Sequence, residues 1–180
     1  MNDTQQRIVV HDRQQLIVIG VSGSSASLAA LMWAASEARR RNAALHVMHV
    51  WEPVRRLAPY AIPAGSPAAA QDLLAACRRL TGAMRETFGP ATPDGVTTEL
   101  AEGAPEHLLV QRSTGADLLV LGATTSLDDP LRRSSGPVAR ACLANARCPL
   151  MIIATAAGPA AISLAVIRTA RDDVVVLAAD

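Results

Sequence analysis

Leu118-Leu-Val-Leu-Gly-Ala-Thr-Thr125 is an apolar run that stops at a glycine and continues into polar residues. A polar loop follows, then Ser134-Ser-Gly-Pro137, and a helix-like segment begins at Val138. This order predicts a buried strand, a loop of the size that surrounds a phosphate, and the start of a helix. In an open α/β sheet, ligands bind at the carboxyl ends of the strands, where a helix N-terminus presents free N–H groups to an anion. The stretch therefore predicts a site for a phosphorylated small molecule.

The rest of the chain alternates apolar runs with segments of helical spacing. Leu16-Ile-Val-Ile-Gly-Val21 is apolar throughout, as expected for a strand buried on both faces. The helix predicted after it ends in three arginines, 39–41, which we interpret as a solvated helix end that complements the helix dipole. The predicted strands are residues 16–21, 45–51, 96–101, 117–121 and 149–154, and the predicted helices are residues 25–42, 67–88, 105–114 and 137–146. Such alternation predicts an α/β fold, a doubly wound open parallel sheet with helices on both faces.

The chain divides into three predicted parts. Residues 1–13 form a flexible N-terminal arm, residues 14–157 hold the α/β domain, and residues 158–180 form a C-terminal extension. Two β-like runs in the extension, residues 162–167 and 174–177, predict a β-hairpin. It would extend the edge of the sheet or reach across to a partner.

The composition excludes several classes of protein. With 180 residues, half of them hydrophobic, the chain is long enough for one domain with a sizeable core. Its formal net charge of +1 argues against electrostatic binding of nucleic acid. All 17 basic residues are arginines, so the Walker-type phosphate loop, which needs a lysine, is excluded.

Three further features concern location. The first residues lack the apolar core of a signal peptide, and no stretch of about 18 residues is apolar enough to span a membrane. The three cysteines form no close pair. Together these features predict a reduced, cytoplasmic protein without membrane contact.

Five stretches together resemble the universal stress proteins of bacteria, over residues 14–154. They are Ile17-Val-Ile-Gly-Val-Ser-Gly-Ser24, Ala30-Leu-Met-Trp-Ala-Ala35, His46-Val-Met-His-Val-Trp-Glu-Pro53, Asp117-Leu-Leu-Val-Leu-Gly122 and Ala146-Arg-Cys-Pro-Leu-Met-Ile-Ile153. The resemblance implies an adenine-nucleotide-binding fold with strand order 3-2-1-4-5 and a role in the stress response. It also implies a homodimer through the last core strand, residues 149–154, with the C-terminal extension as a further candidate contact.

The residues that such proteins use for nucleotides are only partly present. Nucleotide-binding members carry an aspartate after the first strand, where this chain has Ser22. Their phosphate motif is a glycine, two residues, a glycine, nine residues, a glycine and then serine or threonine. Here Gly122 fills the first place and Thr125 the second. Ser135 fills the third, with Gly136 in the hydroxyl place; with one inserted residue, Gly136 becomes the third glycine instead. A β-branched threonine resists the positive φ and the close phosphate contact that glycine allows, so the motif is degraded.

The loop offers other groups to an anion. The hydroxyl groups of Ser134 and Ser135 would cradle an oxyanion. Arg132 and Arg133 would donate charge-assisted hydrogen bonds to phosphate, whereas two aspartates of the same loop would repel it. The loop therefore contains groups that would attract a phosphate and groups that would repel it.

Three functions remain open at this stage. The first is a regulatory protein that binds ATP or another adenine nucleotide between strands one and four, with Mg²⁺ only together with the nucleotide. The family's adenine contacts map onto Val50 and Leu121. The second is a nucleotide-independent interaction module of the same fold, favoured by Ser22 and Thr125. The third, an ATP-dependent enzyme, has no adenylate-forming signature. No nucleophile pairs with a general base, so we expect no enzyme beyond slow ATP hydrolysis or autophosphorylation.

Several other side chains have a structural interpretation. His46 and His49 lie three apart on a predicted strand and so face opposite sides, which disfavours a shared metal ion. Trp51 lies at the carboxyl end of that strand and is a candidate for the pocket wall. Cys142 and Cys148 are expected to be small buried apolar residues.

Overall fold

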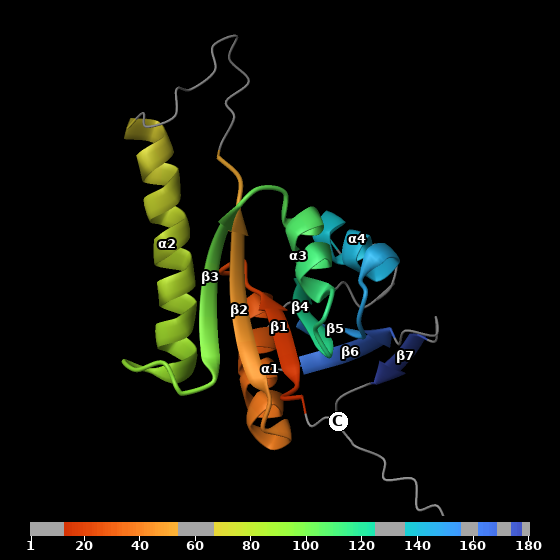
Figure 1. The fold of residues 1–180 in the computed structure, drawn as a ribbon. Coiled ribbons are helices and arrows are strands. Elements are labelled where there is room, and N and C mark those ends of the chain that lie inside the picture. Colours follow the sequence, from red (N-terminus) through yellow and green to blue (C-terminus); the bar gives the residue numbers. More distant parts are fainter. Residues whose placement is uncertain (1–12, 54–66, 125–135, 156–161, 169–173, 178–180) are drawn as a thin grey trace, which may run out of the picture.

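A computed structural model describes residues 13–53, 67–124, 136–155, 162–168 and 174–177 (Figure 1). The helices are α1 (Ser25–Arg41), α2 (Pro67–Phe88), α3 (Pro105–Ser113) and α4 (Pro137–Asn145). The strands are β1 (Leu16–Gly20), β2 (Ala44–Trp51), β3 (Val96–Glu102), β4 (Leu118–Thr124), β5 (Leu150–Thr155), β6 (Ile162–Arg168) and β7 (Val174–Leu177).

The described strands form one sheet in the order β3-β2-β1-β4-β5-β6-β7. The first five are parallel and follow the predicted order 3-2-1-4-5, so the predicted fold is confirmed. β6 runs antiparallel to β5, and β7 antiparallel to β6, which places the C-terminal β extension at one edge of the sheet (Figure 1).

Two apolar layers lie on the two faces of the sheet. Ile17 and Ile19 of β1 pack with α1 and α2 on one face, whereas Val18 packs with α3 and α4 on the other. All three side chains are at most 1% exposed. Burial on both faces explains why the sequence of β1 is apolar without alternation. Figure 1 shows the resulting layers, with α2 on one side of the sheet and α3 beside α4 on the other.

The outer edge of β5 is occupied by the chain itself. β6 pairs with β5 from Leu150, opposite Arg168, to Thr155, opposite Ile162. A strand that is hydrogen-bonded on both sides has no free edge to offer to a second copy. The predicted dimer contact through residues 149–154 would therefore require the hairpin to move, and the homodimer itself stays a prediction.

Asp117 fastens the start of β1 to the start of β4. Its carboxylate accepts a hydrogen bond of 2.7 Å from the backbone N–H of Leu16 and one of 2.7 Å from Arg13. Arg13 also donates to the carbonyl of Gly115 at 2.8 Å. Of the predicted arm, residues 1–12 lie outside the described residues.

The two histidines of β2 point to opposite sides, as predicted. His46 lies within hydrogen-bond distance of Glu99 (2.8 Å) on β3. Arg112 of α3 donates two hydrogen bonds to the same carboxylate. His49 is buried and lies 2.7 Å from the carbonyl oxygen of Val21. Each ring therefore has a structural partner of its own.

The Glu99 cluster predicts a dependence of stability on acid. Hydrogen bonding from Arg112 lowers the pKa of Glu99 from 4.5 to about 2, against partial burial, which raises it. A depressed pKa stabilises the fold above pH 4.5, and this contribution is lost as the pH falls toward 2. Since Arg112 is 42% exposed, we expect less than about 1 kcal/mol.

Glu99→Gln should therefore flatten the pH dependence of the unfolding free energy between pH 4.5 and 2, measured by urea denaturation. Glu102→Gln, at the exposed end of the same strand, is the matched control. An unchanged pH profile for Glu99→Gln would show that the pair contributes nothing to stability.

Candidate functional site

The turn between β1 and α1 is shaped by three serines. Ser24 is the N-cap of α1, and its hydroxyl accepts a hydrogen bond of 3.2 Å from the N–H of Ser27. The hydroxyl of Ser22 lies 3.0 Å from that of Ser24. Gly23 between them has a φ of 84°, which an L side chain rarely adopts. The turn therefore presents a row of hydroxyl groups at the start of α1.

Strand β4 passes unusually close to the first turn of α1 at Gly122. A Cβ added to Gly122 would lie 2.3 Å from the carbonyl oxygen of Ala26 and 2.5 Å from the N of Ser27. The missing side chain thus serves contact between two backbones, in addition to any contact with a ligand. It brings the N-terminus of α1 to the carboxyl end of the central strands.

The start of α4 directs the backbone N–H groups of its first turn toward the carboxyl ends of the strands. Gly136 is the N-cap, with φ −54° and ψ 170°, and as a glycine it has no side chain with which to cap the helix. Pro137 follows at the first helical position, where its missing N–H is tolerated. The N–H groups of the following residues in the first turn have no partner within the helix, so they are available to an anion.

These pieces surround one cavity of about 240 Å³ at the carboxyl ends of β1 and β4. Its lining contains apolar side chains, glycines and two serines, and none of the described lining residues is charged. The lining residues are Gly20, Val21, Ser22, Ser27, Met48, Val50, Pro105, Leu109, Leu121, Gly122, Gly136, Pro137, Val138 and Ala139.

Half of the site residues expected from the sequence meet in this cavity. Ser22, Val50, Leu121, Gly122 and Gly136 all line it, although they come from four separate segments. The other five expected residues lie outside the described residues, and they are Thr125, Arg132, Arg133, Ser134 and Ser135.

The sequence analysis missed the wall that α3 contributes. Pro105 and Leu109 of that helix line the cavity, and Leu109 is only 3% exposed. The sequence feature that could have predicted this wall is Pro105, because it starts a short helix directly after the end of a strand. Trp51, a candidate for the wall, is not among the described residues that line the cavity.

Two cysteines near α4 are unsuited to nucleophilic chemistry. Burial raises the pKa of the Cys142 thiol to about 12 and that of Cys148 to about 11. Thiolate is the reactive form, so both side chains stay protonated near neutral pH. Both are free cysteines, and they are buried in the apolar layer between the sheet and the helices α3 and α4.

Within the ranges that the structure describes, no group of three or more His, Cys, Asp or Glu side chains could hold a metal ion. None of the helices in those ranges is both long and apolar enough to cross a membrane. From its described lining, the cavity can offer a ligand apolar surface, hydroxyl groups and backbone N–H groups.

The sequence of this chain matches the model of one known protein family. The model of the universal stress protein family matches residues 15–154. The chain belongs to the universal stress protein family. The family that the sequence resembled is thereby confirmed, and its match covers β1 to β5 with all four helices.

The curated universal stress proteins that the chain matches are longer than the chain. Universal stress protein Rv3134c of Mycobacterium tuberculosis is 31% identical over 137 residues, which are 76% of this chain and 47% of that protein. The chain thus spans about half the length of the curated relatives it matches.

Solved universal stress proteins share the fold. UspA from Lactobacillus plantarum is 26% identical, with a TM-score of 0.58 over 78% of this chain and 97% of its own. Some universal stress proteins bind adenine nucleotides: one was solved in complex with cAMP. That protein is 24% identical, with a TM-score of 0.47 over 78% of this chain and 97% of its own. At this distance it places no ligand in the present chain.

Proposed function

We propose that this universal stress protein binds an adenine nucleotide, ATP in the first place, in the cavity between β1 and β4. We further propose that it acts as a regulatory protein rather than as an enzyme. The observation that carries the proposal is that one cavity joins apolar side chains to the N-terminus of α4, where the N-cap Gly136 has no side chain. A nucleotide has the matching two parts, a flat apolar base and a charged phosphate chain.

The base would occupy the apolar part of the cavity. Val50 and Leu121 approach it from the sheet and Leu109 from α3. A volume of about 240 Å³ is below the ~300–1,000 Å³ of typical small-molecule sites, so it suits a base and part of a sugar rather than a whole nucleotide. The hydroxyl of Ser22 would meet the ribose.

The phosphates would extend toward the start of α4. Gly136 leaves this helix without a side-chain cap, and the first-turn N–H groups with the helix dipole favour an anion. Arg132 and Arg133 would add charge from the loop before it. Any Mg²⁺ would arrive with the nucleotide, because the described lining holds no carboxylate.

Isothermal titration of the full chain with ATP, ADP, AMP and cyclic AMP tests the proposal. We expect at least one of them to bind with a Kd below about 1 mM, which corresponds to about −4 kcal/mol. If none binds in that range, the nucleotide proposal is rejected.

Gly136→Asp separates binding from folding. A Cβ at this position meets no atom of the described residues within 4 Å, and an aspartate at an N-cap accepts hydrogen bonds from the first turn. Stability should stay within about 0.5 kcal/mol of the parent chain. The new carboxylate would occupy the phosphate position and repel it, so we expect nucleotide affinity to fall about tenfold or more in the same titration.

Ala104→Asp provides the matched control. Ala104 is the N-cap of α3, which also has no side-chain cap and also continues with a proline, but Ala104 itself does not line the cavity. The same charge in the same local setting should change nucleotide affinity less than about threefold. Equal losses in both variants would argue for a general charge effect and against phosphates at α4.

The interaction module without a nucleotide is the second candidate. It is favoured by Ser22, whose hydroxyl lies 3.0 Å from that of Ser24 within its own turn. A hydroxyl engaged in this way is less available to a sugar. A null result in all four titrations would support this function.

A further inference from the structure

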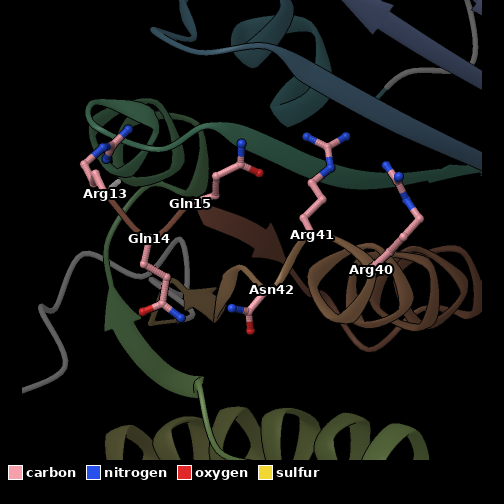
Figure 2. A pocket seen from close by; sticks show the side chains of 6 residues that line it. All are labelled: Arg13, Gln14, Gln15, Arg40, Arg41 and Asn42. Atoms are coloured by element: carbon pink, nitrogen blue, oxygen red, sulfur yellow. The ribbon is translucent and has the colours of Figure 1, made fainter. Parts of the chain in front are cut away.

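A second hollow lies at the opposite end of the sheet from the nucleotide cavity. It is formed where the chain enters β1 and where α1 ends, whereas the cavity lies where β1 ends and α1 begins. Its volume is about 700 Å³, within the ~300–1,000 Å³ of small-molecule sites. The described lining residues are Arg13, Gln14, Gln15, Arg40, Arg41 and Asn42 (Figure 2).

The lining of this hollow has one chemical character. All six side chains end in guanidinium or carboxamide groups, which supply N–H donors, and no carboxylate or apolar side chain is among them. Figure 2 shows the end groups of Arg40, Arg41 and Gln15 pointing to the same side, whereas those of Gln14 and Asn42 point to the other. Such a surface is suited to an anion.

Neighbouring acids hold the arginines in place. Glu37 accepts hydrogen bonds of 2.8 and 2.7 Å from Nε and Nη2 of Arg40, and it also pairs with Arg41. Arg13 is held by the carbonyl of Gly115 and by Asp117. Arg40 is 69% exposed, and its Nη1 remains as a donor for a ligand. Guanidinium groups that are already oriented lose less freedom when they bind.

The hollow carries more positive charge than is required to complement the dipole at the C-terminus of α1. Asn42 adopts a left-handed conformation, and its N–H already caps the carbonyls of Ala38 and Arg39. The three arginines of the lining, Arg13, Arg40 and Arg41, pair with two carboxylates, Glu37 and Asp117, which leaves one positive charge. The helix dipole accounts for part of this preference for cations, but not for a donor-lined hollow between two distant segments.

We propose that this hollow is a second binding site, which takes a small molecule bearing a multiply charged phosphate group such as a diphosphate. Guanidinium forks match the geometry of phosphate oxygens, and two or more arginines can share one diphosphate. The site lies at the other end of the sheet from the nucleotide cavity, and the inference does not rest on the proposed function.

Titration of the full chain with inorganic pyrophosphate at low ionic strength tests the site. We expect saturable binding that Arg40→Gln weakens about tenfold, because one charge-assisted donor group is lost. Arg40→Lys should recover only part of the affinity, since it restores the charge but not the fork. Arg39→Gln removes the same charge from the same run at a residue outside the lining, and should change the affinity less than about twofold.

Two results would overturn the proposal. One is the absence of saturable binding, and the other is an equal loss in Arg39→Gln and Arg40→Gln, which would indicate diffuse attraction only. Pyrophosphate could also bind at the start of α4, so the titration is repeated on Gly136→Asp. Binding should persist in that variant; its disappearance would assign pyrophosphate to the nucleotide cavity and reject the second site.

Discussion

Gly122→Ala is expected to destabilise the fold by about 3 kcal/mol or more, the upper range for an added methyl group in a packed core. The new Cβ would lie 2.3 Å from the oxygen and 2.4 Å from the carbon of the Ala26 carbonyl. Both are backbone atoms of the first turn of α1, so no side chain can rotate away. Either α1 must retreat from β4 or the sheet must bend.

The measurement is the midpoint of urea denaturation, compared with that of Gly82→Ala. Gly82 lies within α2, and a Cβ there meets nothing within 4 Å. In a helix interior alanine is favoured over glycine by about 1 kcal/mol, so this control should be neutral or stabilising. A Gly122→Ala chain as stable as the parent would show that α1 can move at little free-energy cost.

This expectation affects how binding data on Gly122 are interpreted. The sequence suggested that Gly122 lacks a side chain in order to admit phosphate, whereas the structure shows that the space is filled by the backbone of α1. A loss of nucleotide binding in Gly122 variants would therefore be ambiguous. Gly136, which has open space around it, is the informative position.

Truncation after Gly158 is expected to change the oligomeric state. It removes β6 and β7 and exposes the backbone N–H and C=O groups along the outer edge of β5. An exposed apolar edge strand is a template for pairing with another copy. We expect light scattering to report a species with more protomers for the truncated chain than for the full chain.

Truncation after Leu177 is the control, because it keeps both strands of the extension. It should leave the mass of the full chain unchanged. A truncated chain with the same number of protomers as the full chain would show that the edge of β5 does not associate. If the full chain is itself a dimer, its contact lies elsewhere than on the outer edge of β5, which β6 covers.

The fold could be predicted because its signals are local. The run Leu118-Leu-Val-Leu and its counterpart at Leu16 are short and apolar without alternation, which is typical of strands covered on both faces. Alternation with helical segments then restricts the fold to a parallel sheet with crossovers. The family resemblance supplied the order 3-2-1-4-5, which the structure confirms.

The candidate site could be predicted only in part. Ser22 and Gly122 directly follow the predicted strands 16–21 and 117–121, and strand ends of a parallel sheet meet at one edge, so their proximity follows from the pattern. Leu109 reaches the cavity only because α3 packs over β1 and β2, and no local signal marks that contact. Whether residues 149–154 are open to a second copy likewise depends on how the extension pairs with them.

The order of hydrophobic and polar residues along this chain specifies its strands, its helices and the end of the sheet where a ligand would lie. Periodicity carries this information because it records which face of each element is buried. The close approach of Gly122 to α1, the α3 wall and the hollow between residues 13–15 and 40–42 arise from the packing of segments distant in sequence. Such contacts depend on strand register and helix position, to which residues far apart along the chain contribute together.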